Sequence, residues 1–282
     1  MNRLARRRLA HHTATVVCLL LALVAAFPLV SVLTVLIQKG GGIVSWEFLT
    51  GLPQPPAFPG GGIQHAILGS AMVVGIGAML GAPAGLLIGT FLSESGSPRA
   101  GAVRAVVDAM AGIPSIVAGL FGYAVVVTQI GYSAWAGGVA LAVLMVPTVT
   151  RTTEEALRTV PQSYRDASLA LGSPRWRTTV SVVFPAAWSA VVTGLLLGVA
   201  RIAGETAPLV VTVLTNFFVS TDPSSPVATL PYLIYDYGKS AYPKLQEQAW
   251  GAALVLILMV LALNLLVRGL SRLRERRMGS GR

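Results

Sequence analysis

Two oppositely charged residues, Arg201 and Glu205, stand in the otherwise apolar stretch LLLGVARIAGETAPLVVTVL, residues 195–214. A charged side chain at the centre of a bilayer costs about 2.5–3.5 kcal/mol on insertion scales. If the stretch is one helix, the spacing of four places both side chains on one face. A guanidinium is always charged and matches the geometry of an oxyanion. Arg201 therefore suggests a weak, transient binding place for an anion in a membrane pathway.

Glu205 would repel the same anion, so its expected role is to hold Arg201 or a charge of a partner subunit. The alternative is a purely structural ion pair that fixes this helix against a partner. Intramembrane charges usually face the interior of a helix bundle or a water-lined cavity. Both interpretations therefore place the pair away from lipid.

The composition indicates an integral membrane protein. Of the 282 residues, 54% are hydrophobic and 11% are charged, whereas soluble domains carry about 25% charged residues. Six apolar stretches are long enough to cross a hydrocarbon core of about 30 Å. We predict an all-α membrane protein with one domain over residues 1–282 and six transmembrane helices, at about 14–37, 65–92, 105–128, 134–150, 186–214 and 248–267. The first stretch exceeds the roughly 7–15 residues of a signal-peptide core, so we expect it to be retained.

The basic residues predict the orientation of these helices. Seventeen of the 21 lysines and arginines lie before the first helix, between the second and third, between the fourth and fifth, or after the sixth. By the positive-inside rule these segments, and with them both termini, are cytoplasmic. The net charge of +10 is therefore explained by membrane topology and does not require a nucleic-acid partner.

Small residues and prolines predict how the helices pack and bend. Glycines at a spacing of four allow close approach of helices, and they occur at Gly81, Gly85, Gly89, Gly194 and Gly198. Pro114 and Pro208 are expected to kink their helices or to free a carbonyl. Arg104 and Asp108 stand near a helix end, where they can reach the interface, and are interpreted as structural.

Several chemical sites are excluded by the sequence. The single cysteine, Cys18, permits no intrachain disulfide, and the three histidines lack metal-ligand spacing; no metal and no cofactor are predicted. The chain has no phosphate-cradling motif G-x-x-x-x-G-K-[ST], since Leu233 occupies the place of the first glycine before Gly238-Lys239-Ser240. The chain is therefore not expected to hydrolyse ATP itself.

The segment between the fourth and fifth helices, residues 151–185, is the longest predicted cytoplasmic connection. Within it, SYRDASLALG predicts a short helix with Ser163 as N-cap and Gly172 as the C-terminal stop. A short helix with small and apolar residues suits docking into a groove of a soluble partner. A helix resting on anionic lipid is about equally compatible with the composition.

This loop resembles the EAA loop of ABC importer permeases, whose pattern is Glu-Ala-Ala, three residues, Gly, nine residues, Ile, one residue, Leu-Pro. The present chain matches that spacing, with Val182 and Phe184 in the last apolar places and the other pattern residues at Asp166, Ala167, Ser168, Gly172 and Pro185. The resemblance implies a type I importer permease fold. It also implies that the loop is a coupling helix that inserts into a cleft of a separate ATP-binding subunit.

Three further segments, residues 108–123, 146–172 and 200–212, resemble the permeases of phosphate ABC importers, and the GETAPL and PTVTRTTEEAL forms look closer to the PstA-type than to the PstC-type subunit. The resemblance implies a multi-pass subunit of a bacterial inner membrane that forms half of the pathway. Its implied partners are an ATP-binding subunit, a PstC-type permease and an extracytoplasmic phosphate-binding protein. It also marks Arg201, Glu205 and Arg151 as candidate pathway residues, although Arg151 is better explained as an ordinary cytoplasmic arginine.

Two other classes of protein were compared with this interpretation. An ion-coupled secondary transporter could use a buried Arg–Glu pair, but it would not need the docking loop. A membrane-embedded enzyme would require catalytic groups that converge at one membrane face, and none do in the sequence. Within the importer class, molybdate, sulfate and phosphonate are the alternative substrates.

Overall fold

The computed structural model describes residues 3–279, and the side chains of residues 11–266. The described part is all-helical, as predicted. The long helices are α1 Arg3–Gly40, α3 Gln64–Glu94, α7 Ala134–Arg158, α10 Phe184–Ala203 and α13 Pro243–Gly279. The shorter ones are α2 Trp46–Thr50, α4 Ala100–Ala111, α5 Ser115–Gly122, α6 Thr128–Ile130, α8 Gln162–Ala170, α9 Arg175–Thr178, α11 Ala207–Val210 and α12 Leu230–Gly238, with π-helical segments at Tyr123–Val127 and Thr179–Val183.

Five helical stretches within the described residues are long and apolar enough to span a membrane, or six if one bent pair counts as a span. The bent pair replaces the straight helix predicted at 105–128. It consists of α4 and of the stretch Ser115–Ile130, which meet at an angle of 100°. Pro114 has no N–H to donate and disfavours a helical Ile113, so the predicted effect of Pro114 is confirmed as a full break.

The helix predicted at 186–214 begins earlier and ends earlier. Helical structure runs without interruption from Arg175 to Ala203. The π-helical segment Thr179–Val183 ends two residues before Pro185, which cannot donate to the carbonyl four residues before it and whose ring needs room there. At the other end Pro208 cannot bond to the carbonyl of Gly204, and the helix stops before it. The predicted single helix is thus α10 followed by the separate turn α11.

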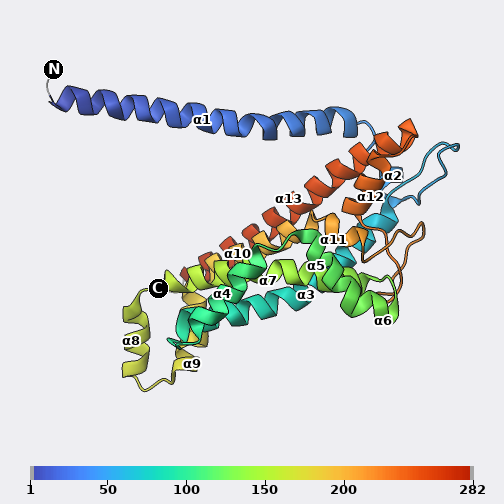
Figure 1. Cartoon of the computed structure of the whole chain (residues 1–282). Helices are drawn as coiled ribbons and strands as arrows, with labels where there is room; N and C mark the ends of the chain where they lie inside the picture. Colours follow the sequence, from blue (N-terminus) through green and yellow to red (C-terminus); the bar gives the residue numbers. More distant parts are fainter. Residues whose placement is uncertain (1–2, 280–282) are drawn as a thin grey trace.

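Helix α7 is the centre of the bundle, with α3 and α10 packed along it (Figure 1). The predicted helix-packing glycines lie in these two contacts. A Cβ added at Gly81, Gly85 or Gly89 would come within 2.6–3.0 Å of an atom of α7, and one at Gly194 or Gly198 within 2.4–2.9 Å. Real Cβ atoms essentially never come closer than 3.0 Å, so glycine sets the distance between these helices.

One stability prediction follows from this contact. A Cβ at Gly85 would lie 2.6 Å from Val149 Cβ, whereas a Cβ at Gly75 of the same helix meets nothing within 4 Å. Overpacking a close contact costs about 1–3 kcal/mol, while alanine is favoured over glycine in an open helix position by about 1 kcal/mol. We expect Gly85→Ala to lower, and Gly75→Ala to keep or raise, the thermal unfolding midpoint in detergent. Equal midpoints would contradict the packing role of Gly85.

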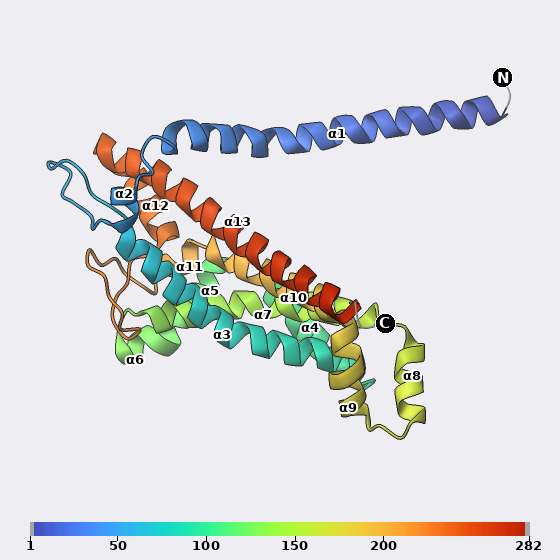
Figure 2. The same cartoon turned by 180° about the vertical axis from the view of Figure 1, so that it is seen from behind.

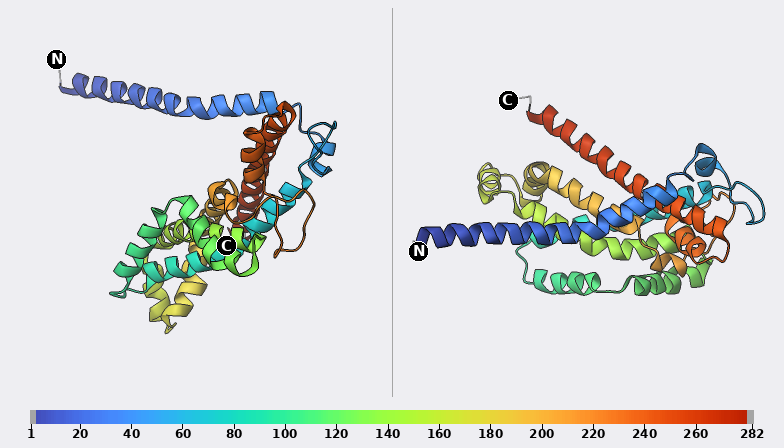
Figure 3. Two further views of the ribbon diagram at one scale, coloured as in Figure 1. Left: turned by 45° about the vertical axis from the view of Figure 1, so that its right-hand side comes forward. Right: turned by 90° about the horizontal axis from the view of Figure 1, so that it is seen from above.

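Helix α1 stands away from the bundle in Figures 1 and 2 and on the left of Figure 3. Its apolar side chains are exposed along nearly the whole helix, and the buried positions among its described residues are Leu36 and Gly40 at its end. There Lys39 Nζ lies 4.9 Å from the ring of Trp250 in α13. The start of α1, the end of α13 and α8 lie at the same end of the molecule (Figure 2).

Candidate functional site

The predicted docking helix is α8, which projects from one end of the bundle together with α9 (Figure 1). It begins one residue before Ser163, so the predicted N-cap is wrong: Pro161 takes that place and makes no side-chain cap bond. The predicted stop is confirmed. Gly172 has φ +84°, and the N–H groups of Gly172 and Ser173 donate to the carbonyls of Leu169 and Ser168, which is the Schellman ending.

Most of α8 faces outward. Asp166 and Ala167 are exposed, and Leu171, just beyond the helix, is 87% exposed. Ser168 lies on the inner side, where its hydroxyl oxygen is 2.9 Å from that of Thr178. The EAA-type residues are therefore divided between an outward face and an inward contact. Pro185 is remote from α8 itself and lies in the first turn of α10.

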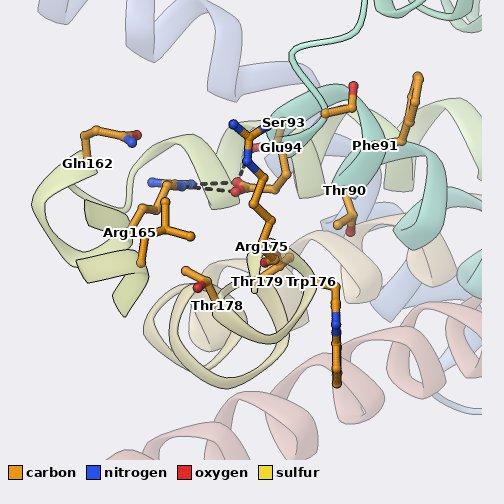
Figure 4. A pocket seen from close by; sticks show the side chains of 12 residues that line it. Thr90, Phe91, Ser93, Glu94, Gln162, Arg165, Arg175, Trp176, Thr178 and Thr179 are labelled. Carbon is orange, nitrogen blue, oxygen red and sulfur yellow. Dashed lines mark hydrogen bonds and ion pairs between the residues drawn. The ribbon is translucent and has the colours of Figure 1, made fainter. Parts of the chain in front are cut away.

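Arg165 holds α8 against the bundle, a role that sequence reasoning missed. Its Nε donates to Glu94 Oε2 at 3.1 Å and its Nη2 to Glu94 Oε1 at 2.7 Å, as Figure 4 shows. Its Nη1 and Nη2 also donate to the carbonyls of Val160 and Leu157 at 2.7 and 2.9 Å. The hydrogen bond to the Glu94 carboxylate raises the pKa of Arg165 above its ordinary value. The partners are 71 residues apart in the sequence, so no local sequence pattern could have predicted the contact.

The same residues line a cleft of about 510 Å³ between the end of α3 and the α8–α9 pair (Figure 4). Its walls carry hydroxyl groups, an amide and charged groups. These are supplied by Thr90, Ser93, Glu94, Ser95, Gln162, Arg165, Arg175, Thr178 and Thr179, with Phe91, Leu169 and Trp176 as apolar lining. The cleft thus separates α8 from the membrane-spanning part of α3, and the Arg165–Glu94 contact bridges it.

Arg201 and Glu205 do not lie in one helix and form no ion pair among the described residues. Arg201 is in the last turn of α10, and Glu205 follows the end of that helix. Because the helix ends at Ala203, the prediction of one continuous helix through both residues is wrong. The Arg201 side chain is exposed and Glu205 is partly buried. A broken helix with charges at the break resembles the discontinuous helices at which transporters hold ions.

Arg151 is paired with Asp108 of α4, so its guanidinium already holds a carboxylate. One turn further along α7, Glu154 is 5% exposed and binds two arginines. Arg104 Nη2 lies 2.5 Å, and Arg158 Nη2 2.7 Å, from Glu154 Oε1. Arg104 and Asp108 therefore bind α7 rather than each other, consistent with the structural role predicted for them.

The arrangement of helices defines the class of protein. A chain of a bacterial alginate ABC transporter, solved with an alginate-bound periplasmic protein, aligns with a TM-score of 0.68 over 94% of this chain and 96% of that chain, at 12% identity. A chain of the MetNI methionine ABC transporter in an inward-facing form aligns with a TM-score of 0.59 over 74% and 94%, at 21% identity. The fold is that of an ABC importer permease.

The family follows from the sequence match. Residues 81–280 match the family "binding-protein-dependent transport system inner membrane component", and the chain belongs to this family of multi-pass inner-membrane proteins. A phosphate transport system permease protein PstA of Yersinia pestis is 41% identical over 94% of this chain and 90% of that protein. The PstA 1 permease protein of Mycobacterium tuberculosis is 39% identical over 92% and 88%.

Proposed function

We propose that this chain is the PstA-type permease subunit of an ATP-driven phosphate importer. The observation that carries the proposal is 41% identity, over 94% of the chain, to a permease named for phosphate transport. The chain contributes half of the pathway and is not itself an enzyme. A separate ATP-binding subunit hydrolyses ATP, a PstC-type permease supplies the other half, and an extracytoplasmic phosphate-binding protein delivers the ion.

In this proposal Arg201 is the transient binding place for phosphate. Its side chain is exposed on the isolated chain and has no ion-pair partner within the described residues, and a fork of donors suits an oxyanion. Glu205 is not paired with Arg201, and we assign it the role of binding a positive charge of the second permease. Arg151 is a weaker candidate, because phosphate would have to displace Asp108 from its guanidinium.

Coupling to the ATP-binding subunit is assigned to α8 and its flanks. The outward Asp166 and Ala167 would contact that subunit, and Gly172 would end the helix so that Leu171 projects. Ser168 would link α8 to α9 through its hydrogen bond with Thr178. Pro185 lies in the first turn of α10, into which the helical structure of α9 continues. The end of the molecule that carries α8, with the start of α1 and the end of α13, is then cytoplasmic.

The function is tested by reconstituting the chain in proteoliposomes with the three partners and measuring uptake of radiolabelled phosphate. We expect ATP-dependent uptake that unlabelled phosphate suppresses and a similar excess of sulfate or molybdate does not. If another oxyanion suppresses uptake instead, that oxyanion and not phosphate is the substrate. Uptake that persists without the ATP-binding subunit would indicate an ion-coupled transporter.

A further inference from the structure

The contact between Arg165 and Glu94, here called the latch, is the most enclosed ionic contact at the α8 end of the molecule. The two side chains are 13% and 17% exposed, although α8 projects and most of its residues are exposed. Two parallel N–H to oxygen bonds join the guanidinium and the carboxylate. Such charge-assisted, bidentate pairs are stronger and more directional than ordinary hydrogen bonds. The latch therefore fixes both the orientation of α8 and its distance from the end of α3.

The latch joins α8 to two membrane-spanning helices at once. Glu94 is the last residue of α3, and Ser93 Oγ donates to its Oε1 at 2.9 Å. Leu157 and Val160, whose carbonyls accept from Arg165, lie at and just beyond the end of α7. Carbonyls at a helix end lack partners in their own helix, so one guanidinium satisfies them and the carboxylate together.

Helices α3 and α7 in turn are closely packed against each other. The glycines of α3 bring its backbone against α7 so closely that Gly89 has no room for a Cβ, which would come 2.6 Å from the Thr150 carbonyl oxygen. Close-packed helices transmit displacement because the contact cannot be compressed. A push on α8 thus reaches the α3–α7 pair through the latch, separately from the chain connection through α9 to α10.

We propose that Arg165 and Glu94 act as positioning residues that transmit movement of α8 to the α3–α7 pair, so that ATP hydrolysis in the partner subunit is converted into opening of the pathway. The proposal rests on the function proposed above. Without the latch, α8 would still dock and ATP would still be hydrolysed, but the displacement would be taken up within the cleft between α8 and α3. The latch is therefore expected to set the amount of phosphate moved per ATP.

The test compares Arg165→Gln, Glu94→Gln and the double variant in the reconstituted transporter, with phosphate uptake and ATP hydrolysis measured together. We expect phosphate moved per ATP to fall at least about tenfold in each single variant, as loss of a charged hydrogen bond allows, with no further fall in the double variant. The matched control is Arg177→Gln, which removes an exposed arginine of α9. An unchanged ratio in both single variants, or additive losses in the double variant, would overturn the latch.

A second measurement needs neither phosphate nor ATP. Hydrogen exchange on the purified permease in detergent should show faster exchange of the α8 amides in Glu94→Gln, with the amides of α13 unchanged, because Glu94 lies outside α8 and affects it through Arg165. If hydrogen exchange of the α8 amides is unchanged in Glu94→Gln, the latch is overturned, even if this variant does not assemble with the partner subunits. If the unaltered chain fails to import phosphate, the proposed function fails, while the exchange result still decides whether the latch exists.

Discussion

Replacing Arg201 with Gln is expected to reduce phosphate uptake at least about tenfold, because a hydrogen bond to a charged group contributes about 1.5–3 kcal/mol. Gln keeps much of the side-chain length and a donor but removes the permanent charge and the fork. Arg201 lies in the last turn of α10 with its side chain exposed, so the change leaves no buried partner unpaired. Folding and assembly with the ATP-binding subunit should therefore persist. Uptake by proteoliposomes and co-purification of that subunit are the two measurements.

Arg201→Lys is the matched control, since it retains the charge without the planar fork, and we expect it to retain part of the uptake. Normal uptake by Arg201→Gln would eliminate Arg201 from the pathway. Loss of uptake together with loss of assembly would instead favour the structural alternative, in which Arg201 holds the second permease. Because Arg201 and Glu205 form no ion pair among the described residues, pairing with each other does not explain why either charge is present.

Replacing Leu171 with Asp is expected to abolish binding of the ATP-binding subunit under conditions in which the unaltered chain binds it. A leucine that is 87% exposed at the tip of a projecting helix has apolar surface for a partner to cover, and burying it contributes about 1.5–3 kcal/mol. A carboxylate in the same place would lose this contribution and would also have to be desolvated. The affinity should fall by more than about tenfold, measured by titrating the labelled subunit onto permease in detergent.

Two control variants make this result specific. Leu171→Met conserves volume and apolar character and should bind normally. Val219→Asp introduces the same charge at an exposed position in the loop before α12, at the end of the bundle away from α8, and should also bind normally. Equal binding by Leu171→Asp and the unaltered chain would place the docking surface elsewhere than on α8.

The local elements could be predicted because their causes are local. The length of an apolar run determines whether it can span a membrane, and it placed the start of α3 within one residue and that of α13 within five. A glycine with φ +84° is needed to end α8, and Gly172 was predicted as that stop. The break at Pro114 follows from the missing N–H. The EAA-type spacing likewise lies within one continuous segment of 20 residues, from Asp166 to Pro185.

The charged contacts could not be predicted, because they join residues that only the packed bundle brings together. Arg165 was counted as one of many cytoplasmic arginines, yet its carboxylate partner is 71 residues away. Arg151 pairs with Asp108, and Arg104 pairs with Glu154, which lies 50 residues later in the sequence. Neither pair has the spacing of three or four residues that would predict a contact within one helix. Conversely Arg201 and Glu205 have the spacing of a helical pair, and the break before Pro208 removes the geometry that the spacing implied.

The sequence by itself thus determined the class, most of the membrane-spanning stretches and the short helix α8 with its glycine stop, because hydrophobic length, proline, glycine and a contiguous motif act through neighbours in the chain. The tertiary structure decided which charges meet. Long side chains reach several ångströms beyond the backbone, and their pairing depends on the distance and rotation of whole helices. The distance and rotation of α3 and α7 are set by the glycine contacts between them. Only in that arrangement does Glu94 lie within hydrogen-bonding distance of Arg165.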